Sequence, residues 1–237
     1  MLTTTALTSQ PLPPSTYSQI EPPVAVRNKR GIASTQHLWP QHSTLNISLF
    51  DMPEKAKDYI KKNINLWQPH TNLKFNFITT NDGDIRISGK KDDSGSWSAV
   101  GTKAKLMPMD EPTMHIDLVQ TADLLNQAIR HEFGHALGLV HEHQHPDHRV
   151  KWDKKKLHAE TKKLGVNEED AANNILKVLD RDATTHSSYD PKSVMHYKVE
   201  PWLTLDGCGV AFNEEISEGD KKFMATLYPP AAASTTA

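Results

Sequence analysis

The stretch "HEFGHALGLVHEHQHPDH", residues 131–148, contains six of the thirteen histidines of this 237-residue chain. The residues before it, "ADLLNQAIR" (122–130), continue a pattern in which apolar side chains recur every three or four positions. Such a period predicts an amphipathic helix. The apolar positions are Leu124, Leu125, Ala128, Ile129, Phe133, Ala136 and Leu137. We therefore expect a helix over about 122–137 that carries the first two histidines of the stretch.

The first two histidines have a spacing that suits a metal ion. His131 and His135 are four positions apart, so a helix turns about 400° between them and both imidazoles leave one face. Two imidazoles one turn apart fit zinc, which takes nitrogen ligands in tetrahedral geometry. Glu132 lies about 100° round the helix from His131. Its carboxylate can therefore approach the open side of the metal as a general base for an activated water.

A third ligand requires the helix to stop. His141 follows His135 by six positions, which would turn it about 240° away on a continuing helix. Gly138 stands between them, and a glycine at a helix C-terminus readily adopts the left-handed conformation that ends the helix. The motif thus predicts a helix that ends at a glycine, after which the chain turns back so that a third histidine reaches the same metal. Its residues are His131, Glu132, His135, Gly138 and His141.

The motif is specific enough to favour a metal site over coincidence. HExxH alone fixes three positions and occurs on ordinary amphipathic helices, whereas HExxHxxGxxH fixes five. Two other interpretations stay open, a non-catalytic zinc-binding module and a histidine-rich metal buffer. Glu132 argues against both, because neither needs a base. His143, His145 and His148 follow in a polar, proline-containing stretch, and we expect them at the surface.

Composition restricts the remaining classes. Hydrophobic residues make up 37% and charged residues 24%, with a formal net charge of −2. This is typical of a globular domain and gives no electrostatic drive toward nucleic acid or an anionic membrane. We expect neither as a partner, and we expect a monomer. Cys208 is the single cysteine, so no intrachain disulfide can form.

The remaining segments indicate one folded region between two tails. Residues 1–36 are rich in Thr, Ser and Pro and predict a disordered or propeptide-like lead-in, while 231–237 form a short tail. The N-terminus lacks the basic start and apolar core of a signal peptide, and no membrane span is present, so we expect a cytoplasmic or non-classically exported protein. Dibasic Lys29-Arg30 stands just before Gly31.

Periodicity between the tails predicts an α+β fold. Strands are expected at 45–50, 72–78, 84–89, 97–101 and 113–118, and helices at 52–68, 122–137, 153–164, 167–178 and from 217. Asp51 is a plausible cap for the first helix, and Ser217 with Asp220 forms a weaker version of the capping box of the last. An upper half, 37–138, should hold the strands, and a lower half, 139–230, helices and irregular loops.

A second motif makes the chain resemble a known family. HExxHxxGxxH marks the metzincin metalloproteases, which also carry a methionine in a tight turn below the metal. "YDPKSVMHY" (189–197) supplies Met195 in a Ser-x-Met-His-Tyr form. Three features resemble the astacin branch of this group. They are the Ser-x-Met-His-Tyr form of the turn, the position of Glu142 directly after the third histidine, and "LWP" (38–40). The resemblance extends from about Leu38 to Pro229.

The resemblance implies a fold and an activity. The fold would be a metzincin-type zincin, with a twisted mixed sheet and two long helices in the upper subdomain. The activity would be that of a zinc metalloendopeptidase with one Zn²⁺ per chain, acting on an extended peptide paired with an edge strand, here 97–101. Relatives of this kind are mostly secreted.

The resemblance also implies roles for single residues. Tyr197 would lie near the zinc and support the oxyanion, Met195 would pack beneath the site, and Glu142 would hold a trimmed N-terminus. The plainer alternatives are a core tyrosine and a core methionine. The chain departs from typical astacins in lacking disulfides, an aspartate-bearing inhibitory propeptide and part of the signature after His141. It therefore resembles disulfide-free microbial relatives.

Overall fold

The computed structural model describes residues 37–91, 95–180, 184–186 and 188–230, so the expected lead-in and C-terminal tail lie outside the described residues. Five strands form one sheet in the order β2-β1-β3-β5-β4. Neighbouring strands pair in parallel except β4, which runs antiparallel to β5, so the sheet is mixed. The strands are β1 (Thr44–Phe50), β2 (Lys74–Ile78), β3 (Ile85–Ser88), β4 (Trp97–Ser98) and β5 (Met114–His115).

The last two strands are shorter than their sequence patterns predict. The alternation predicts β4 over 97–101 and β5 over 113–118, and each forms only two residues of regular ladder. Two residues after β4, the chain enters the 3₁₀-helix η3 (Gly101–Leu106), which begins at a glycine with a φ of 50°. That conformation favours glycine and turns the chain away from the sheet, which limits the length of the pairing.

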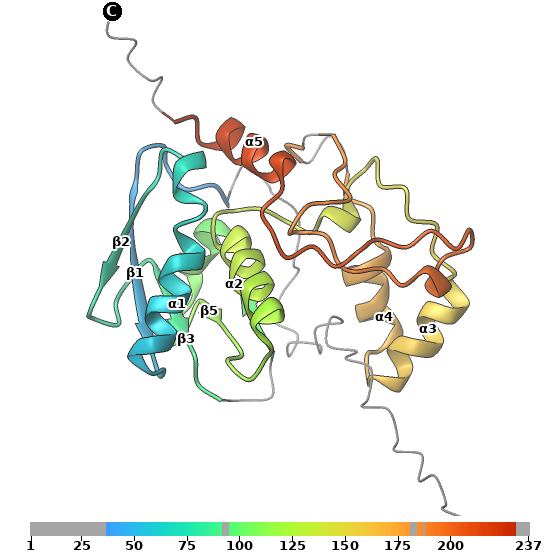
Figure 1. Ribbon diagram of the computed structural model, residues 1–237, viewed down its shortest axis with the longest axis horizontal. Coiled ribbons are helices and arrows are strands. Elements are labelled where there is room, and N and C mark those ends of the chain that lie inside the picture. Colours follow the sequence, from blue (N-terminus) through green and yellow to red (C-terminus); the bar gives the residue numbers. More distant parts are fainter. Residues whose placement is uncertain (1–36, 92–94, 181–183, 187, 231–237) are drawn as a thin grey trace, which may run out of the picture.

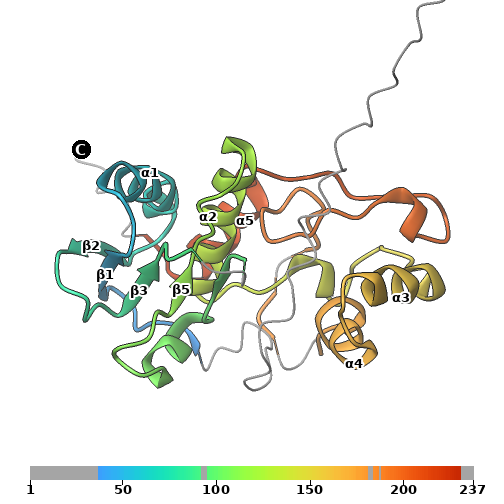
Figure 2. The same ribbon diagram turned by 90° about the horizontal axis from the view of Figure 1, so that it is seen from below.

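Two helices lie side by side on one face of the sheet, as both ribbon views show (Figure 1, Figure 2). They are α1 (Glu54–Ile64) and α2 (Ala122–Ala136). The expected helix over 52–68 is thus shorter, and a separate 3₁₀ turn, η2 (Gln68–His70), follows it. The expected cap at Asp51 is wrong: its φ is 55°, and Pro53 occupies the N-cap position without a side-chain hydrogen bond.

The chain after α2 is mostly irregular and lies on the opposite side of Figure 1 from the sheet. Its helical elements are η4 (Glu142–Gln144), α3 (Lys154–Lys163), α4 (Glu168–Ala171), the π-helical turn η5 (Ala172–Leu176) and η6 (Pro201–Leu203). The final helix, α5 (Glu218–Leu227), returns to the sheet side, where Met224 and Tyr228 join the core around Trp39 and Ile129. The capping box of Ser217 and Asp220 is confirmed at its start.

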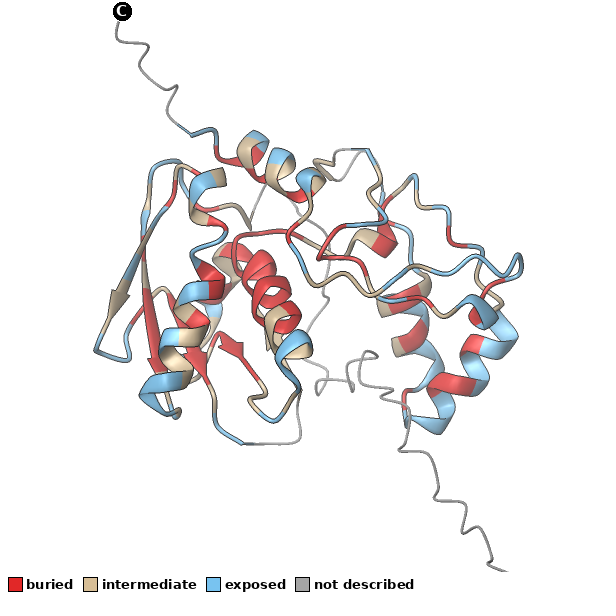
Figure 3. Cartoon of the chain, viewed as in Figure 1, coloured by how far each residue is buried: buried red, intermediate tan, exposed pale blue. Residues whose placement is uncertain are grey.

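The second half of α2 is buried on all sides, in contrast to the amphipathic α1 and α3 (Figure 3). Every residue from Gln127 to Ala136 is buried, including the polar side chains of Gln127, Arg130, His131, Glu132 and His135. Burial of five polar side chains on one helix costs free energy unless each finds a partner, and so many on one helix is unusual outside a functional site. No helix of the described residues combines the length and apolar character that crossing a membrane requires.

Candidate functional site

Both histidines of α2 are oriented by backbone carbonyls. Nδ1 of His131 lies 2.8 Å from the carbonyl oxygen of Val194, and Nδ1 of His135 lies 2.9 Å from that of Leu139. A carbonyl oxygen only accepts hydrogen bonds, so each Nδ1 donates. The neutral ring then presents the lone pair of Nε2, which is the arrangement typical of a metal-ligating histidine.

The end of α2 is the glycine stop that the sequence predicts. Gly138 has a φ of 105°, its N–H donates to His135 at 2.8 Å, and the N–H of Leu139 donates to Gly134 at 3.0 Å. This pair of hydrogen bonds is a Schellman motif. The same turn brings the carbonyl of Leu139 back to the ring of His135, so the stop both orients the second histidine and returns the chain toward His141.

Residues near both ends of the described chain hold the last turn of α2. The indole of Trp39 donates to the carbonyl of Ala136 at 2.8 Å, and the hydroxyl of Tyr228 donates to that of Leu137 at 2.8 Å. The Tyr228 hydroxyl also accepts from the backbone N–H of Trp39 at 3.1 Å. The last carbonyls of a helix lack partners within it, so these side chains satisfy groups that burial would otherwise penalise.

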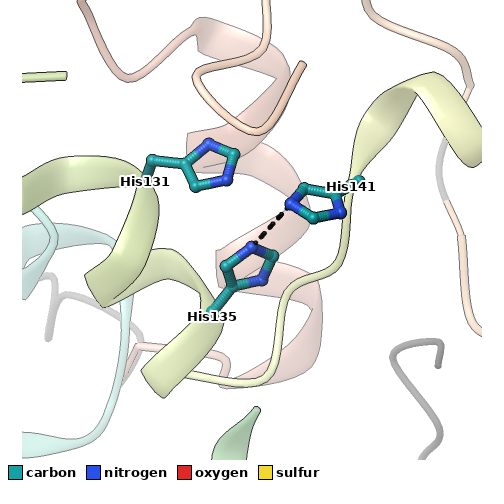
Figure 4. Close-up of side chains that lie close together, drawn as sticks. All are labelled: His131, His135 and His141. Carbon is teal, nitrogen blue, oxygen red and sulfur yellow. Dashed lines mark hydrogen bonds between the residues drawn. The ribbon is translucent and has the colours of Figure 1, made fainter. Parts of the chain in front are cut away.

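The three predicted ligands meet at one point. Ligand nitrogens of His131, His135 and His141 all lie within 4.8 Å of one another, and Nε2 of His135 lies 3.0 Å from Nε2 of His141. Figure 4 shows the three rings converging from α2 and from the segment that follows it. Tetrahedral zinc with Zn–N bonds of about 2.0–2.1 Å separates two nitrogen ligands by about 3.3 Å. The residues present therefore fit a zinc ion.

Tyr197 packs against this histidine triad. Its ring centroid lies 4.4 Å from that of His141 and 6.0 Å from that of His131. It also stacks on His143, with centroids 4.4 Å apart and planes 21° apart. The structure thus places Tyr197 beside the three histidines that are predicted to bind zinc, and His143 packs on its ring.

The turn that carries Met195 is held from α5 and in turn holds the first ligand. Asp220 accepts hydrogen bonds from the Ser193 hydroxyl at 2.6 Å and from the Val194 N–H at 2.8 Å. The carbonyl of the same Val194 faces the ring of His131. Burial raises the pKa of Asp220, while its hydrogen bonds oppose that rise. A continuous chain of hydrogen bonds therefore joins the start of α5 to a predicted metal ligand.

Met195 packs directly against α2. It is buried, and a Cβ added to Gly134 would approach its Sδ to 2.5 Å, closer than real contacts allow. Glycine in a helix interior costs roughly 0.5–1 kcal/mol relative to alanine. The close approach of methionine explains why α2 carries one there.

Glu142 is half-buried and lines a cavity together with Met195, Asp220 and Phe223. Its side chain accepts a hydrogen bond from the Asp190 N–H at 2.8 Å, and its own N–H donates to the Met195 carbonyl at 3.0 Å. Burial raises its pKa to about 8. A carboxyl in such a place would favour a cationic partner, which would reverse the effect of burial on its pKa.

The expectation that the following histidines lie at the surface is wrong for two of them. His143 and His145 are 1% and 5% exposed, and His148 is half-buried. Nε2 of His143 donates to the Asn174 carbonyl at 2.9 Å, and burial lowers the pKa of His143 to about 3. The polar neighbours of these histidines predicted that they would be exposed. In the structure η4 packs against η5, and η5 supplies the backbone carbonyl to which His143 donates.

Sequence reasoning missed three residues that support the site. Gly134 could have been recognised, because a glycine inside a strongly periodic helix indicates close packing against it. Asp220 is recognisable in the sequence only as a helix cap, and its second role depends on a turn 26 positions away. Tyr228 had no signal, because its partner Leu137 lies 91 positions earlier.

Comparisons with known proteins agree with this geometry. The family model described as Astacin, a family of peptidases, matches residues 31–202. Among solved structures, "Structure of myroilysin" is 33% identical with a TM-score of 0.78 and covers 82% of this chain and 96% of that one. High choriolytic enzyme 1, a hatching enzyme zinc-protease from Oryzias latipes (Medaka fish), shares the fold at 17% identity with a TM-score of 0.60, covering 86% and 100%.

A search of curated proteins gives no match. The family model nevertheless spans most of the described chain, and it includes all three histidines and the methionine turn. The astacin family uses zinc, and the histidine triad forms a site able to hold it. The fold, a mixed sheet with helices, is that of the metzincins. The chain is therefore a member of the astacin family of metalloproteases.

Proposed function

We propose that the protein is a zinc-dependent endopeptidase that hydrolyses internal peptide bonds of proteins. One observation carries the proposal. Three histidines converge on one point, and Glu132, which is 2% exposed, lies next to the first of them on the buried part of α2. A site that only stores zinc has no need of a buried carboxylate beside its ligands.

The chain's own groups supply the proton transfers. Zinc held by His131, His135 and His141 would polarise the scissile carbonyl and lower the pKa of the attacking water. Glu132 takes the proton of that water and delivers it to the leaving amine. Its burial suits this role, because the carboxylate lies beside the predicted ligands and out of bulk solvent.

Tyr197 stabilises the tetrahedral intermediate. Its phenol can donate a hydrogen bond to the developing oxyanion, an interaction that strengthens as charge accumulates. The contacts of the Tyr197 ring support this role. The ring packs against His141, one of the three proposed ligands, and it also stacks on His143, which lies outside the triad.

The substrate would bind as an added strand. β4 is an outermost strand of the sheet, so one of its backbone edges has no strand partner within the sheet of the described residues. An extended peptide can pair with such an edge through backbone hydrogen bonds. β4 also contacts α2, so a peptide bound there runs past the helix that carries His131 and Glu132.

The alternative is a non-catalytic zinc-binding module with the same fold, and a pair of variants separates the two. Glu132→Gln should lower peptide hydrolysis by about 10²–10⁴-fold while zinc content stays at one per chain. The triple variant His131→Ala, His135→Ala, His141→Ala should lose both zinc and activity. Zinc is measured by elemental analysis and hydrolysis with casein.

A control variant, Glu168→Gln, changes an exposed carboxylate at the start of α4 and should behave as the unmodified chain. Casein cleavage by Glu132→Gln at a near-normal rate would remove Glu132 from the mechanism. Full zinc content in the unmodified chain with no cleavage of any protein substrate would favour the non-catalytic module.

A further inference from the structure

His115 of β5 is enclosed between two backbone carbonyls. The residue is 2% exposed, with Nδ1 2.6 Å from the carbonyl oxygen of Gly95 and Nε2 2.7 Å from that of Lys90. Both distances are short for N–H···O hydrogen bonds, and both oxygens precede β4 in the chain. The ring therefore connects Lys90 and Gly95 to the sheet.

Both ring nitrogens of His115 face a backbone acceptor. A carbonyl oxygen only accepts hydrogen bonds, so a ring nitrogen that carries a proton can donate to it. The ring is therefore held between one segment that follows β3 and one that precedes β4.

Gly95, one of the two residues held in this way, lies two positions before β4. Regular pairing of β4 with β5 extends over two residues, with one further backbone hydrogen bond from Ala99 to Thr113 at 2.8 Å. Trp97 is the cross-strand neighbour of His115, and the two rings stack with planes 23° apart. Because so short a ladder fixes a strand poorly, the side chain of His115 is a main support for the position of β4.

The position of β4 matters because it faces the helix that carries the site. β4 contacts α2, and it lies at the sheet edge opposite β2. A peptide paired with β4 takes its register and its distance from Glu132 from that strand. A β4 strand that is held less firmly would therefore bind the peptide more weakly.

We propose that His115 is a positioning residue for the substrate peptide. It acts through β4 rather than through the histidine triad or the reacting bond. The proposal rests on the proposed function in one respect, namely that the peptide pairs with β4. The contacts of His115 and their effect on β4 do not depend on any activity.

Hydrogen exchange tests the effect on β4. His115→Phe should speed amide exchange in residues 95–99 by about tenfold or more, because a lost hydrogen bond weakens local structure. The matched control is Ile47→Val in β1, a modest core substitution on another strand. It should leave exchange at 95–99 unchanged. Unchanged exchange in His115→Phe would also overturn the proposal.

Steady-state kinetics test the effect on substrate. In His115→Phe the KM for a peptide substrate should rise about tenfold, with kcat within about twofold and zinc content unchanged, the pattern of a lost binding interaction. Ile47→Val should change neither constant. Normal KM in His115→Phe would show that β4 position does not govern binding. A chain without peptidase activity would refute the proposed function, while the exchange results would still decide whether His115 supports β4.

Discussion

The helices α2 and α3 end in the same way, and only one of these ends builds a site. After α2, Gly138 donates to His135 and the next residue donates to Gly134. After α3, Gly165 donates to Lys162 at 3.1 Å and Val166 donates to Thr161 at 2.9 Å. Both glycines have a positive φ, 105° and 75°. The local chemistry of the two stops is the same Schellman motif.

The surroundings of the two stops differ completely. A Cβ at Gly165 would meet nothing within 4 Å, whereas one at Gly138 would approach Leu38 to 2.9 Å. The stop after α2 is also held by Trp39 and Tyr228, which satisfy its last carbonyls. The glycine motif therefore supplies the turn, and long-range contacts determine whether the turn places a ligand.

The largest effect should come from valine at the first of these glycines. Gly138→Val forces a β-branched residue into a left-handed conformation and against Leu38, so the turn must shift and displace His141. We expect zinc affinity to fall about 10- to 100-fold, the range seen when support of a metal ligand is lost. Competition with a chromogenic chelator measures the dissociation constant.

Gly165→Val is the matched control. It meets the same conformational strain, about 1–3 kcal/mol, in open space and far from any ligand. Both variants should unfold at lower denaturant concentration, and only Gly138→Val should bind zinc more weakly. Equal zinc affinity in the two variants would mean that His141 reaches the triad without the glycine stop.

A smaller effect is expected where the site depends on α5. Asp220→Ala removes the acceptor of Val194 and Ser193, and a buried donor left without a partner costs about 1–3 kcal/mol. The carbonyl of Val194 should then hold the ring of His131 less firmly. We expect a zinc dissociation constant about tenfold higher and an altered visible spectrum of the cobalt-substituted chain.

Asp153→Ala provides the comparison on α3. Asp153 caps that helix by accepting from the Lys156 N–H, so its loss should cost about 1 kcal/mol without reaching the triad. A cobalt spectrum of Asp220→Ala identical to that of the unmodified chain would reduce Asp220 to an ordinary helix cap.

Much of the site could be predicted because its decisive part is local. The helical spacing of His131 and His135, the glycine stop and the short return to His141 are all contained in residues 131–141. The same holds for α2 and the longer strands, whose periods are visible without any tertiary information. The prediction of His131, His135 and His141 as zinc ligands therefore required no knowledge of distant residues.

The remainder depended on contacts between distant parts of the chain. His143 and His145 were expected in solvent because their neighbours are polar, yet both are buried, and η5 supplies the hydrogen-bond partner of His143. Asp220 and Tyr228 act on residues 26 and 91 positions away. β4 and β5 were predicted too long, because the glycine turn that ends β4 is not encoded in the alternation of its side chains.

The smallest predicted effect concerns the lead-in, which lies outside the described residues. Lys29 and Arg30 precede Gly31, and the family model begins its match at residue 31. Glu142 lies in its cavity with its pKa raised to about 8 by burial, a state that a nearby ammonium group would relieve. Cleavage after Arg30 would create such a group on Gly31. We therefore expect trimming to let the new N-terminus pair with Glu142.

Four chains test this pairing: the full chain, a chain that begins at Gly31, and a Glu142→Ala version of each. Pairing predicts that the shorter chain melts a few degrees higher, since a charge-assisted ion pair at this half-buried carboxyl contributes on the order of 1–2 kcal/mol. Glu142→Ala should remove that gain and leave the two lengths equal. A gain that persists without Glu142 would assign it to loss of the lead-in itself, and identical melting in all four chains would leave residues 1–30 without a role in the folded domain. Glu142 directly follows His141 in the chain but is not one of the three proposed ligands, so zinc content should be the same in all four chains. Unchanged zinc content distinguishes Glu142 from Gly138 and Asp220, whose replacement should weaken zinc binding.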